Sequence, residues 1–288
     1  MQVDFFIVGA PKAGTTSLYH YLNEHLEIEM SSQKEPDYFS DSLIQNKGMY
    51  YGKNRIDTLE KYNNLFINPE VKLRGEGSVS YLFYDDVPLK IKTYNPEAKI
   101  IIILRDPVDR AFSHYLMDYR LGLVSESFED IITKKSKHKN AHLFYQQYIQ
   151  VSEYAPQIKR YLNVFKRENI LFIDYEDFKN DVAGVVNNVY LFLGVNDDFQ
   201  PNLNKKHNTY TMPKNGIIRY IYSFVSFRNF LTSIFSKGLV KSIRNSLFIN
   251  DRKPKLSNAN REFLNEFFKE DLKELNALLN KDFTKWLK

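Results

Sequence analysis

Residues 9–17 of this 288-residue chain, Gly-Ala-Pro-Lys-Ala-Gly-Thr-Thr-Ser, bring together side-chain types that bind anions. Lys12 supplies a positive charge, and Thr15, Thr16 and Ser17 supply three consecutive hydroxyl donors. A cation and several donors at a glycine-bearing turn can hold a phosphate or a sulfate, and can stabilise charge that develops during a transfer of such a group. The segment therefore predicts an anion-binding loop.

The residues on either side of this loop predict a strand before it and a helix after it. Residues 5–8 form a short apolar run with the composition of a buried strand, and Leu18, Leu22 and Leu26 recur at helical spacing. A strand, a tight loop and a helix direct several backbone N–H groups and the helix dipole at one point, which suits a phosphate or a sulfate.

The loop departs from the nucleotide-triphosphate loop, whose form is G-x-x-x-x-G-K-[ST]. Gly9 and Gly14 have the required separation, but Thr15 stands at the lysine position and Lys12 lies inside the loop. A glycine turn with one solvated lysine is the alternative that carries no function. The combination of a lysine with three hydroxyl residues favours a functional loop.

Residues 11–18, P-K-A-G-T-T-S-L, resemble the 5′-phosphosulfate loop of the sulfotransferases that use 3′-phosphoadenosine 5′-phosphosulfate (PAPS). The form is similar to that of the carbohydrate and heparan-sulfate branch and of its bacterial relatives. The resemblance implies that Lys12 also acts catalytically, on the leaving oxygen. It further implies that the phosphosulfate is held by Lys12, Ala13, Gly14, Thr15, Thr16 and Ser17.

An unbroken apolar run at residues 99–104 predicts a strand that is covered on both faces, as in a parallel sheet between helices. Pro107 suits the start of the helix that follows, and Asp106 could cap it.

Residues 105–115, R-D-P-V-D-R-A-F-S-H-Y, resemble the 3′-phosphate motif of the same family. The resemblance implies that Arg105 and Ser113 bind the 3′-phosphate of PAPS. An arginine suits that dianion because its guanidinium can donate two parallel hydrogen bonds.

The segment Lys34-Glu35-Pro36 is similar to the K-E-P segment of the heparan-sulfate-type enzymes, in which the glutamate is the expected general base. Pro36 favours an extended conformation at Glu35. Residues 74–82 resemble a second family segment, although a glycine and a valine replace its lysine and its proline. Glu76 in this segment is a second candidate base, and the alternative is that it is a buried hydrogen-bonding residue.

A further apolar run at residues 170–173 predicts another strand, which ends in Asp-Tyr-Glu-Asp-Phe. This ending resembles a family stretch whose tyrosine can lie against the adenine, so the resemblance implies that role for Tyr175; ordinary packing is the alternative. Residues 182–193 predict an amphipathic helix closed by Gly194.

Residues 199–250 contain no Asp or Glu. Lys205 and Lys206 occupy the place of the family's C-terminal nucleotide-contacting loop, and the resemblance implies that they contact the nucleotide. The later basic residues could instead recruit an acidic acceptor or an anionic membrane surface, or could form a solvated face. These residues are Arg228, Lys237, Lys241 and Arg244.

Composition sets further bounds on the class of protein. A hydrophobic content of 43% and a charged content of 26% are typical of globular proteins. The absence of cysteine excludes disulfides and thiolate chemistry. A net charge of +5 suits an anionic ligand without requiring nucleic acid. No metal-ligand cluster, signal peptide or run of membrane-spanning length is visible, so we expect a metal-independent, cytoplasmic, bacterial enzyme.

These observations predict an α/β fold in one domain over residues 1–288. We expect a three-layer sandwich with a mostly parallel central sheet and a phosphate-binding loop after the first strand. The resemblance implies sulfuryl transfer from PAPS to a hydroxyl or an amine of a glycan or glycolipid, with adenosine 3′,5′-bisphosphate (PAP) as product. The alternatives are a nucleotide kinase, although Arg105 stands where such enzymes commonly place an Asp, and a non-catalytic module that binds anions.

Overall fold

The computed structural model describes residues 2–51, 55–203, 212–223, 238–239, 246–249 and 254–287. The predicted nucleotide contacts Lys205 and Lys206 lie outside these ranges. The same is true of the later basic residues, for which the sequence leaves open an acceptor or membrane role and a solvated face, namely Arg228, Lys237, Lys241 and Arg244. Among the described residues, we find no helix whose length and apolar character would let it cross a bilayer.

The centre of the fold is a five-stranded sheet in the order β2-β3-β1-β4-β5, in which every neighbouring pair is parallel. β1 and β4 are buried along nearly their whole length, because both of their faces are covered. Their apolar composition suits this position in the sheet. The five strands are β1 Phe5–Gly9, β2 Ile28–Met30, β3 Leu73–Gly77, β4 Lys99–Leu104 and β5 Ile170–Asp174.

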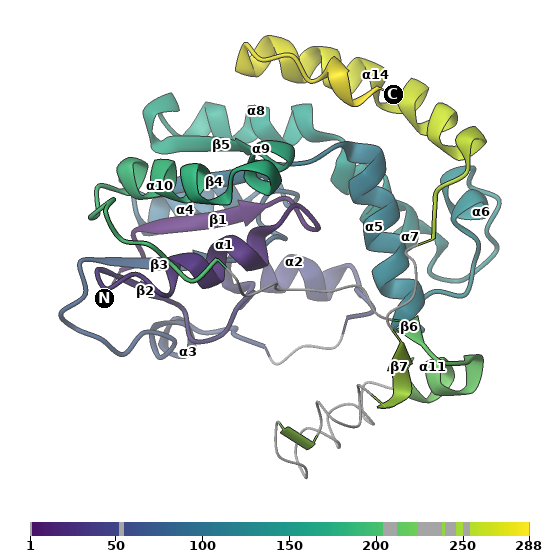
Figure 1. Cartoon of the computed structure of the whole chain (residues 1–288), viewed down its shortest axis with the longest axis horizontal. Coiled ribbons are helices and arrows are strands. Elements are labelled where there is room, and N and C mark those ends of the chain that lie inside the picture. Colours follow the sequence, from purple (N-terminus) through teal and green to yellow (C-terminus); the bar gives the residue numbers. More distant parts are fainter. Residues whose placement is uncertain are drawn as a thin grey trace.

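Helices cover both faces of the sheet. On one face α1 packs on α10, and on the other α4 packs on α8, with α14 lying along the outside of α8 (Figure 1). The bounds of these helices are α1 Thr15–Leu22, α4 Val87–Tyr94, α8 Tyr154–Val164, α10 Val182–Leu193 and α14 Asn258–Leu279. The expected three-layer α/β architecture is confirmed, and the central sheet is parallel throughout.

A second group of helices stands beside the sheet and has a hydrophobic core of its own. The long helix α5, Pro107–Arg120, packs on α7, Ala141–Tyr148, and α14 also contacts α5. Val108, Phe128, Tyr148 and Phe268 are among the buried residues of this core. The group therefore holds α5 firmly next to the end of β4.

The remaining elements of the described residues are short. The helices are α2 Asp41–Asn46, α3 Leu59–Asn63, α6 Phe128–Ile132, α9 Tyr175–Asn180 and α11 Gly216–Ser223, and single 3₁₀ turns occur at Tyr38–Ser40, Gln150–Ser152, Arg167–Asn169 and Thr284–Trp286. The two-residue strands β6 Met212–Pro213 and β7 Phe248–Ile249 form a separate antiparallel pair.

Several local predictions from the sequence are confirmed. Helix α5 begins at Pro107, and Asp106 caps it by accepting hydrogen bonds from the N–H groups of Val108 and Asp109 at 2.8 and 3.1 Å. Helix α10 ends at Gly194, whose φ of 78° is left-handed. The prediction that Leu26 continues the first helix is wrong, because α1 ends at Leu22 and Leu26 is 87% exposed.

Parallel strands all end at the same edge of a sheet, so the segments that follow them meet there. The phosphosulfate-type loop follows β1, and Glu35 lies five residues after β2 ends at Met30. Arg105 follows β4 directly, and Tyr175 follows β5 directly. The fold therefore brings residues from distant parts of the sequence to one place.

Candidate active site

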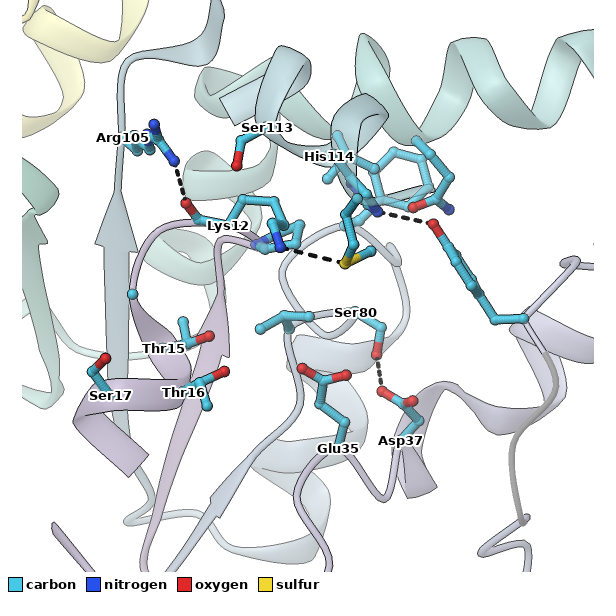
Figure 2. Close-up of a pocket in the computed structure, with 18 of the residues that line it drawn as sticks. Lys12, Thr15, Thr16, Ser17, Glu35, Asp37, Ser80, Arg105, Ser113 and His114 are labelled. Atoms are coloured by element: carbon cyan, nitrogen blue, oxygen red, sulfur yellow. Dashed lines mark hydrogen bonds between the residues drawn. The ribbon is translucent and has the colours of Figure 1, made fainter. Parts of the chain in front are cut away.

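A cavity of about 920 Å³ opens at this edge of the sheet (Figure 2). Segments from all five strand ends line it, and helix α5 and the end of α2 form further walls. Of the described residues predicted to have a role in the site, the cavity is lined by Lys12, Gly14, Thr15, Thr16, Ser17, Glu35, Arg105, Ser113 and Tyr175. The side chain of Ala13 is buried in the core and does not line it.

The loop after β1 presents the start of helix α1 to the cavity. Gly14 occupies the N-cap position with φ 90°, and no side chain caps the helix there. The first N–H groups of a helix have no partner within it and carry a partial positive charge, so this uncapped end is available to an anion. Thr15, Thr16 and Ser17 form the first turn and add their hydroxyl groups.

A side chain at position 14 would narrow this cradle. A Cβ atom added to Gly14 would lie 3.2 Å from the Phe178 ring and 3.4 Å from the Tyr175 ring, and the left-handed φ disfavours any L-residue. The glycine thus keeps the approach to the helix end open. This geometry fits a phosphate or sulfate group.

The ammonium group of Lys12 lies inside the cavity, where Nζ donates to the thioether sulfur of Met117 at 3.3 Å. A thioether is a weak acceptor, and among the described residues Lys12 makes no ion pair within 4.0 Å. Burial, and to a smaller extent the charge of Arg120, lowers the pKa of Lys12 to about 8, although the charges of Asp118 and Glu35 oppose the shift. A desolvated cation facing a weak acceptor is suited to an anionic ligand.

Arg105 connects the two predicted phosphate-binding segments. Its Nη1 donates to the carbonyl oxygen of Lys12 at 2.8 Å, and its guanidinium lies 4.7 Å from the centre of the Tyr175 ring. Ser113 lies two turns along α5 and lines the same cavity. Figure 2 shows Arg105 and Ser113 at the same end of the pocket. The structure therefore brings Arg105, Ser113 and Tyr175 together.

Glu35 lines the cavity on the side away from Arg105 (Figure 2). Its Oε1 pairs with Lys34 Nζ at 2.5 Å, and its N–H donates to the carbonyl oxygen of Gly77 at the end of β3. The expectation of an extended backbone at Glu35 is wrong, because its φ is 57°. The bond to Gly77 helps fix the turn that Pro36 alone would disfavour.

The second candidate base, Glu76, lies in β3 and is completely buried. It does not line the cavity, and its Oε2 accepts a hydrogen bond from Tyr62 at 3.1 Å. Burial raises the pKa of Glu76 to about 8, although the nearby hydroxyls of Ser78, Tyr81 and Tyr62 oppose the shift. These positions match the alternative of a buried hydrogen-bonding residue.

Backbone strain is concentrated at this site. Among the described residues, five other than glycine have positive φ, and three of these line the cavity: Lys12, Glu35 and Asp37, with φ of 69°, 57° and 56°. Such conformations are costly for residues other than glycine and persist where surrounding contacts over-determine them. Their clustering here indicates that the positions of these side chains are constrained.

A buried hydrogen-bond chain supports the wall formed by α5. Tyr51 donates to Asp118 Oδ2 at 2.7 Å, so its oxygen accepts from His114 Nε2 at 2.9 Å. The other nitrogen of His114 then accepts from Arg110 Nη1 at 3.2 Å. Burial lowers the pKa of His114 well below its usual range, so the ring is neutral. Asp118 Oδ2 also accepts from Tyr50 and Tyr148.

Sequence reasoning did not identify this chain of residues. The i, i+4 spacing of His114 and Asp118 places both on one face of α5 and is the available signal. Tyr50 and Tyr51 come from an irregular segment after α2, and no local pattern indicates that they reach α5.

Comparison with known proteins gives a consistent family. The family model described as "Sulfotransferase domain" matches residues 2–276. The chain is similar, with a TM-score of 0.72 and 29% identity, to the crystal structure of a sulfotransferase from Alicyclobacillus acidocaldarius, and each chain is covered completely.

Two mammalian relatives are also similar in sequence. The bifunctional heparan sulfate N-deacetylase/N-sulfotransferase 3 of Homo sapiens is 28% identical over 282 residues, which are 96% of this chain and 30% of that protein. Carbohydrate sulfotransferase 15 of Mus musculus is 27% identical over 243 residues, which are 66% of this chain and 43% of that protein. The chain thus spans less than half the length of either relative.

Proposed function

Because the chain belongs to the sulfotransferase family, we propose that its cavity binds PAPS and that it transfers the sulfuryl group to a hydroxyl or an amine of a carbohydrate acceptor. The names of the mammalian relatives, which include a carbohydrate sulfotransferase and a heparan sulfate N-sulfotransferase, support a glycan as acceptor. PAPS supplies the sulfuryl group, and PAP is the product that remains.

The observation that carries this proposal is the placement of Lys12 between two sets of groups. On one side lie the uncapped start of α1 and the guanidinium of Arg105, both suited to phosphate. On the other side lies the carboxylate of Glu35, whose charge acts on Lys12. Cation, anion cradle and candidate base thus surround one cavity.

In the proposed reaction Glu35 accepts the proton of the acceptor group as its oxygen or nitrogen forms a bond to sulfur. Lys12 and the N–H groups of the loop stabilise the negative charge that develops on the bridging oxygen as its bond to sulfur breaks. The proton resides on Glu35 at the end of the transfer, and Lys34 is placed to pair with the Glu35 carboxylate before the step, while it is still ionised.

The nucleotide is proposed to contact Arg105 and Ser113 through its 3′-phosphate and Tyr175 through its adenine. The 4.7 Å separation between the Arg105 guanidinium and the Tyr175 ring supports this grouping, because both side chains border the same end of the cavity. Lys205 and Lys206 are proposed to complete the nucleotide contacts from the segment that follows Leu203 at the cavity wall.

The test is transfer of ³⁵S from labelled PAPS to a panel of glycans, glycosides and alcohols. The proposal predicts labelled product and acceptor-dependent release of PAP. Magnesium-dependent turnover of ATP without consumption of PAPS would instead support a kinase, and nucleotide binding without transfer to any acceptor would support a non-catalytic module.

A further inference from the structure

The cavity has two ends that differ in chemistry. Its nucleotide end contains Thr15, Ser17 and Arg105, and its acceptor end contains Glu35, Asp37 and Ser80, with Lys12 between them (Figure 2). The cavity as a whole is larger than a sugar hydroxyl requires, since its lining also includes residues of α2 and of the second half of α5. The residues that line it therefore indicate which class of acceptor it can bind.

The face of helix α5 that lines the cavity becomes less polar from one turn to the next. Ser113, Met117 and Leu121 follow one another at i, i+4 spacing, and all three line the cavity. Ser113 borders the nucleotide end, Met117 contacts Lys12, and Leu121 lies a further turn away from the phosphate-binding residues. The lining face of the helix thus becomes apolar with distance from Ser113 and the nucleotide end.

The opposite walls of the acceptor end are also apolar or aromatic. Ile44 and Met49 line it from α2 and the segment after it, and Phe83 and Tyr84 line it from the segment after β3. The ammonium group of Lys47 lies 5.2 Å from the Phe83 ring centre and 5.5 Å from that of Tyr84, which secures these two rings. Apolar walls of this kind favour an acceptor with apolar surface.

The charged groups of the acceptor end do not favour a polyanion. Three carboxylates line it, those of Glu35, Asp37 and Asp41, and Arg55 is the guanidinium among its described lining residues. Arg55 already forms a two-point contact with Asp41 at 3.2 and 2.6 Å. Glu35 is likewise paired with Lys34 at 2.5 Å. An acidic glycan would therefore have to displace Glu35 from Lys34 or Asp41 from Arg55 to gain a cationic partner, and Asp37 would repel it at short range.

We propose that the acceptor is an uncharged sugar joined to an apolar chain or ring, the chemistry of an alkyl or aryl glycoside or of a glycolipid. This proposal rests on the sulfotransferase function proposed above and narrows its acceptor class. The sugar hydroxyl reaches Glu35, and the apolar part lies along the wall that Leu121, Ile44 and Phe83 form.

The first experiment compares matched acceptors with the full chain. Methyl and hexyl glycosides of the same neutral sugars, at concentrations below micelle formation, are tested beside non-sulfated acidic oligosaccharides of heparan type in ³⁵S transfer from PAPS. Calorimetry with saturating PAP measures binding of the same acceptors without any transfer. We expect the hexyl compound to exceed its methyl partner about tenfold or more in kcat/KM and in affinity, since each buried methylene contributes to binding.

The second experiment substitutes one of the apolar residues that line the cavity. Leu121→Ser shortens the apolar face of α5 at a residue that is only partly buried, and Leu89→Ser makes the same change at a position on α4 that is 63% exposed and outside the cavity. We expect the hexyl-to-methyl ratio to fall several-fold in Leu121→Ser and to stay at the wild-type value in Leu89→Ser.

The outcomes separate the acceptor class from the reaction. Preferential binding or sulfation of the acidic oligosaccharides, or equal treatment of methyl and hexyl glycosides, would overturn the acceptor class while leaving the sulfotransferase function in place. Failure to bind PAP or to consume PAPS would contradict the underlying function instead.

Discussion

Arg105 Nη1 donates a hydrogen bond to the carbonyl oxygen of Lys12 at 2.8 Å, so the side chain predicted to bind the 3′-phosphate also holds the loop predicted to bind the phosphosulfate. The bond helps to maintain the left-handed conformation of Lys12, whose φ is 69°. A hydrogen bond therefore joins two predicted binding segments that are far apart in the sequence, and substitutions at Arg105 affect both.

The first prediction follows from this connection. Arg105→Ala should weaken PAP binding, since a hydrogen bond to a charged group contributes roughly 1.5–3 kcal/mol, and should also lower kcat because the loop loses its support. Among the described residues Ser113 forms no hydrogen bond to the loop, so Ser113→Ala should weaken PAP binding with little effect on kcat. Calorimetry and steady-state kinetics on both variants distinguish these outcomes; an unchanged kcat in Arg105→Ala would show that the bond to Lys12 has no role in turnover.

The second prediction concerns the role of Lys12. Lys12→Ala should reduce turnover more than it reduces PAP affinity, because the charge is needed where the leaving oxygen becomes negative; loss of one such donor typically costs roughly 3 kcal/mol in the barrier. Single-turnover kinetics with PAPS, paired with calorimetry for PAP, measure both quantities. An alanine variant with wild-type turnover would remove Lys12 from the chemistry.

The third prediction uses the lowered pKa of Lys12, which is about 8. The cation is present below this pH and is lost as pH rises through it, so PAP affinity should fall above about pH 8, and the fall should be absent in Lys12→Met. Between about pH 8 and the normal pKa of 10.5 the unfolded chain binds more protons than the folded chain, so stability rises with pH over this range. At neutral pH, below this range, the folded protein bears the full cost of burying the charge. Lys12→Met should therefore raise the melting temperature at pH 7.

The fourth prediction separates the two candidate bases. Glu35→Gln should reduce transfer by roughly a hundredfold or more and preserve PAP affinity, because glutamine keeps the shape but cannot accept the proton. Glu76→Gln should remain active, since burial already keeps Glu76 protonated at pH 7, with its pKa at about 8. The opposite pattern would move the base to Glu76.

Stability measurements provide a control for Glu76. Its folded-state pKa is raised, so its contribution to stability is present below the normal value of 4.5 and is lost as pH rises towards 8. Glu76→Gln should remove this loss, and urea unfolding of both proteins across that pH range measures it. An identical pH dependence in the two proteins would contradict the raised pKa.

The fifth prediction concerns the buried chain at Asp118. Tyr51→Phe removes the hydroxyl that joins His114 to Asp118 and should loosen the segment that lines the acceptor end next to Met49. We expect a several-fold higher KM for the acceptor and an unchanged affinity for PAP. A loss of PAP affinity would instead show that the chain supports the nucleotide end.

Much of the framework could be predicted from the sequence because its signals are local. The strand at residues 99–104 is an unbroken apolar run, and the Asp106 cap and Pro107 mark the start of α5 within two residues. Lys12 and Arg105 could be identified because each lies in a short motif directly after a strand. The parallel order of the strands then brings these motifs together.

The rest depends on contacts between distant segments, which no local pattern records. Tyr50 and Tyr51 reach Asp118 across 67 or more residues of chain, and the Arg105 bond to Lys12 spans 93. The conformation of Glu35 departs from the preference that Pro36 imposes because its N–H bonds to Gly77, which belongs to another strand. In each case tertiary contacts decide what the local sequence leaves open or disfavours.

The central claim is sulfuryl transfer from PAPS at this cavity, and acceptor-dependent release of PAP tests it most directly. Purified chain, ³⁵S-labelled PAPS and the glycoside panel are incubated with excess chelator, and labelled acceptor and PAP are both quantified. We predict that the two products appear in equal amounts, and that both fall together in Lys12→Ala and Glu35→Gln. PAP release that is unaffected by any acceptor, or label transfer that survives both substitutions, would contradict the account.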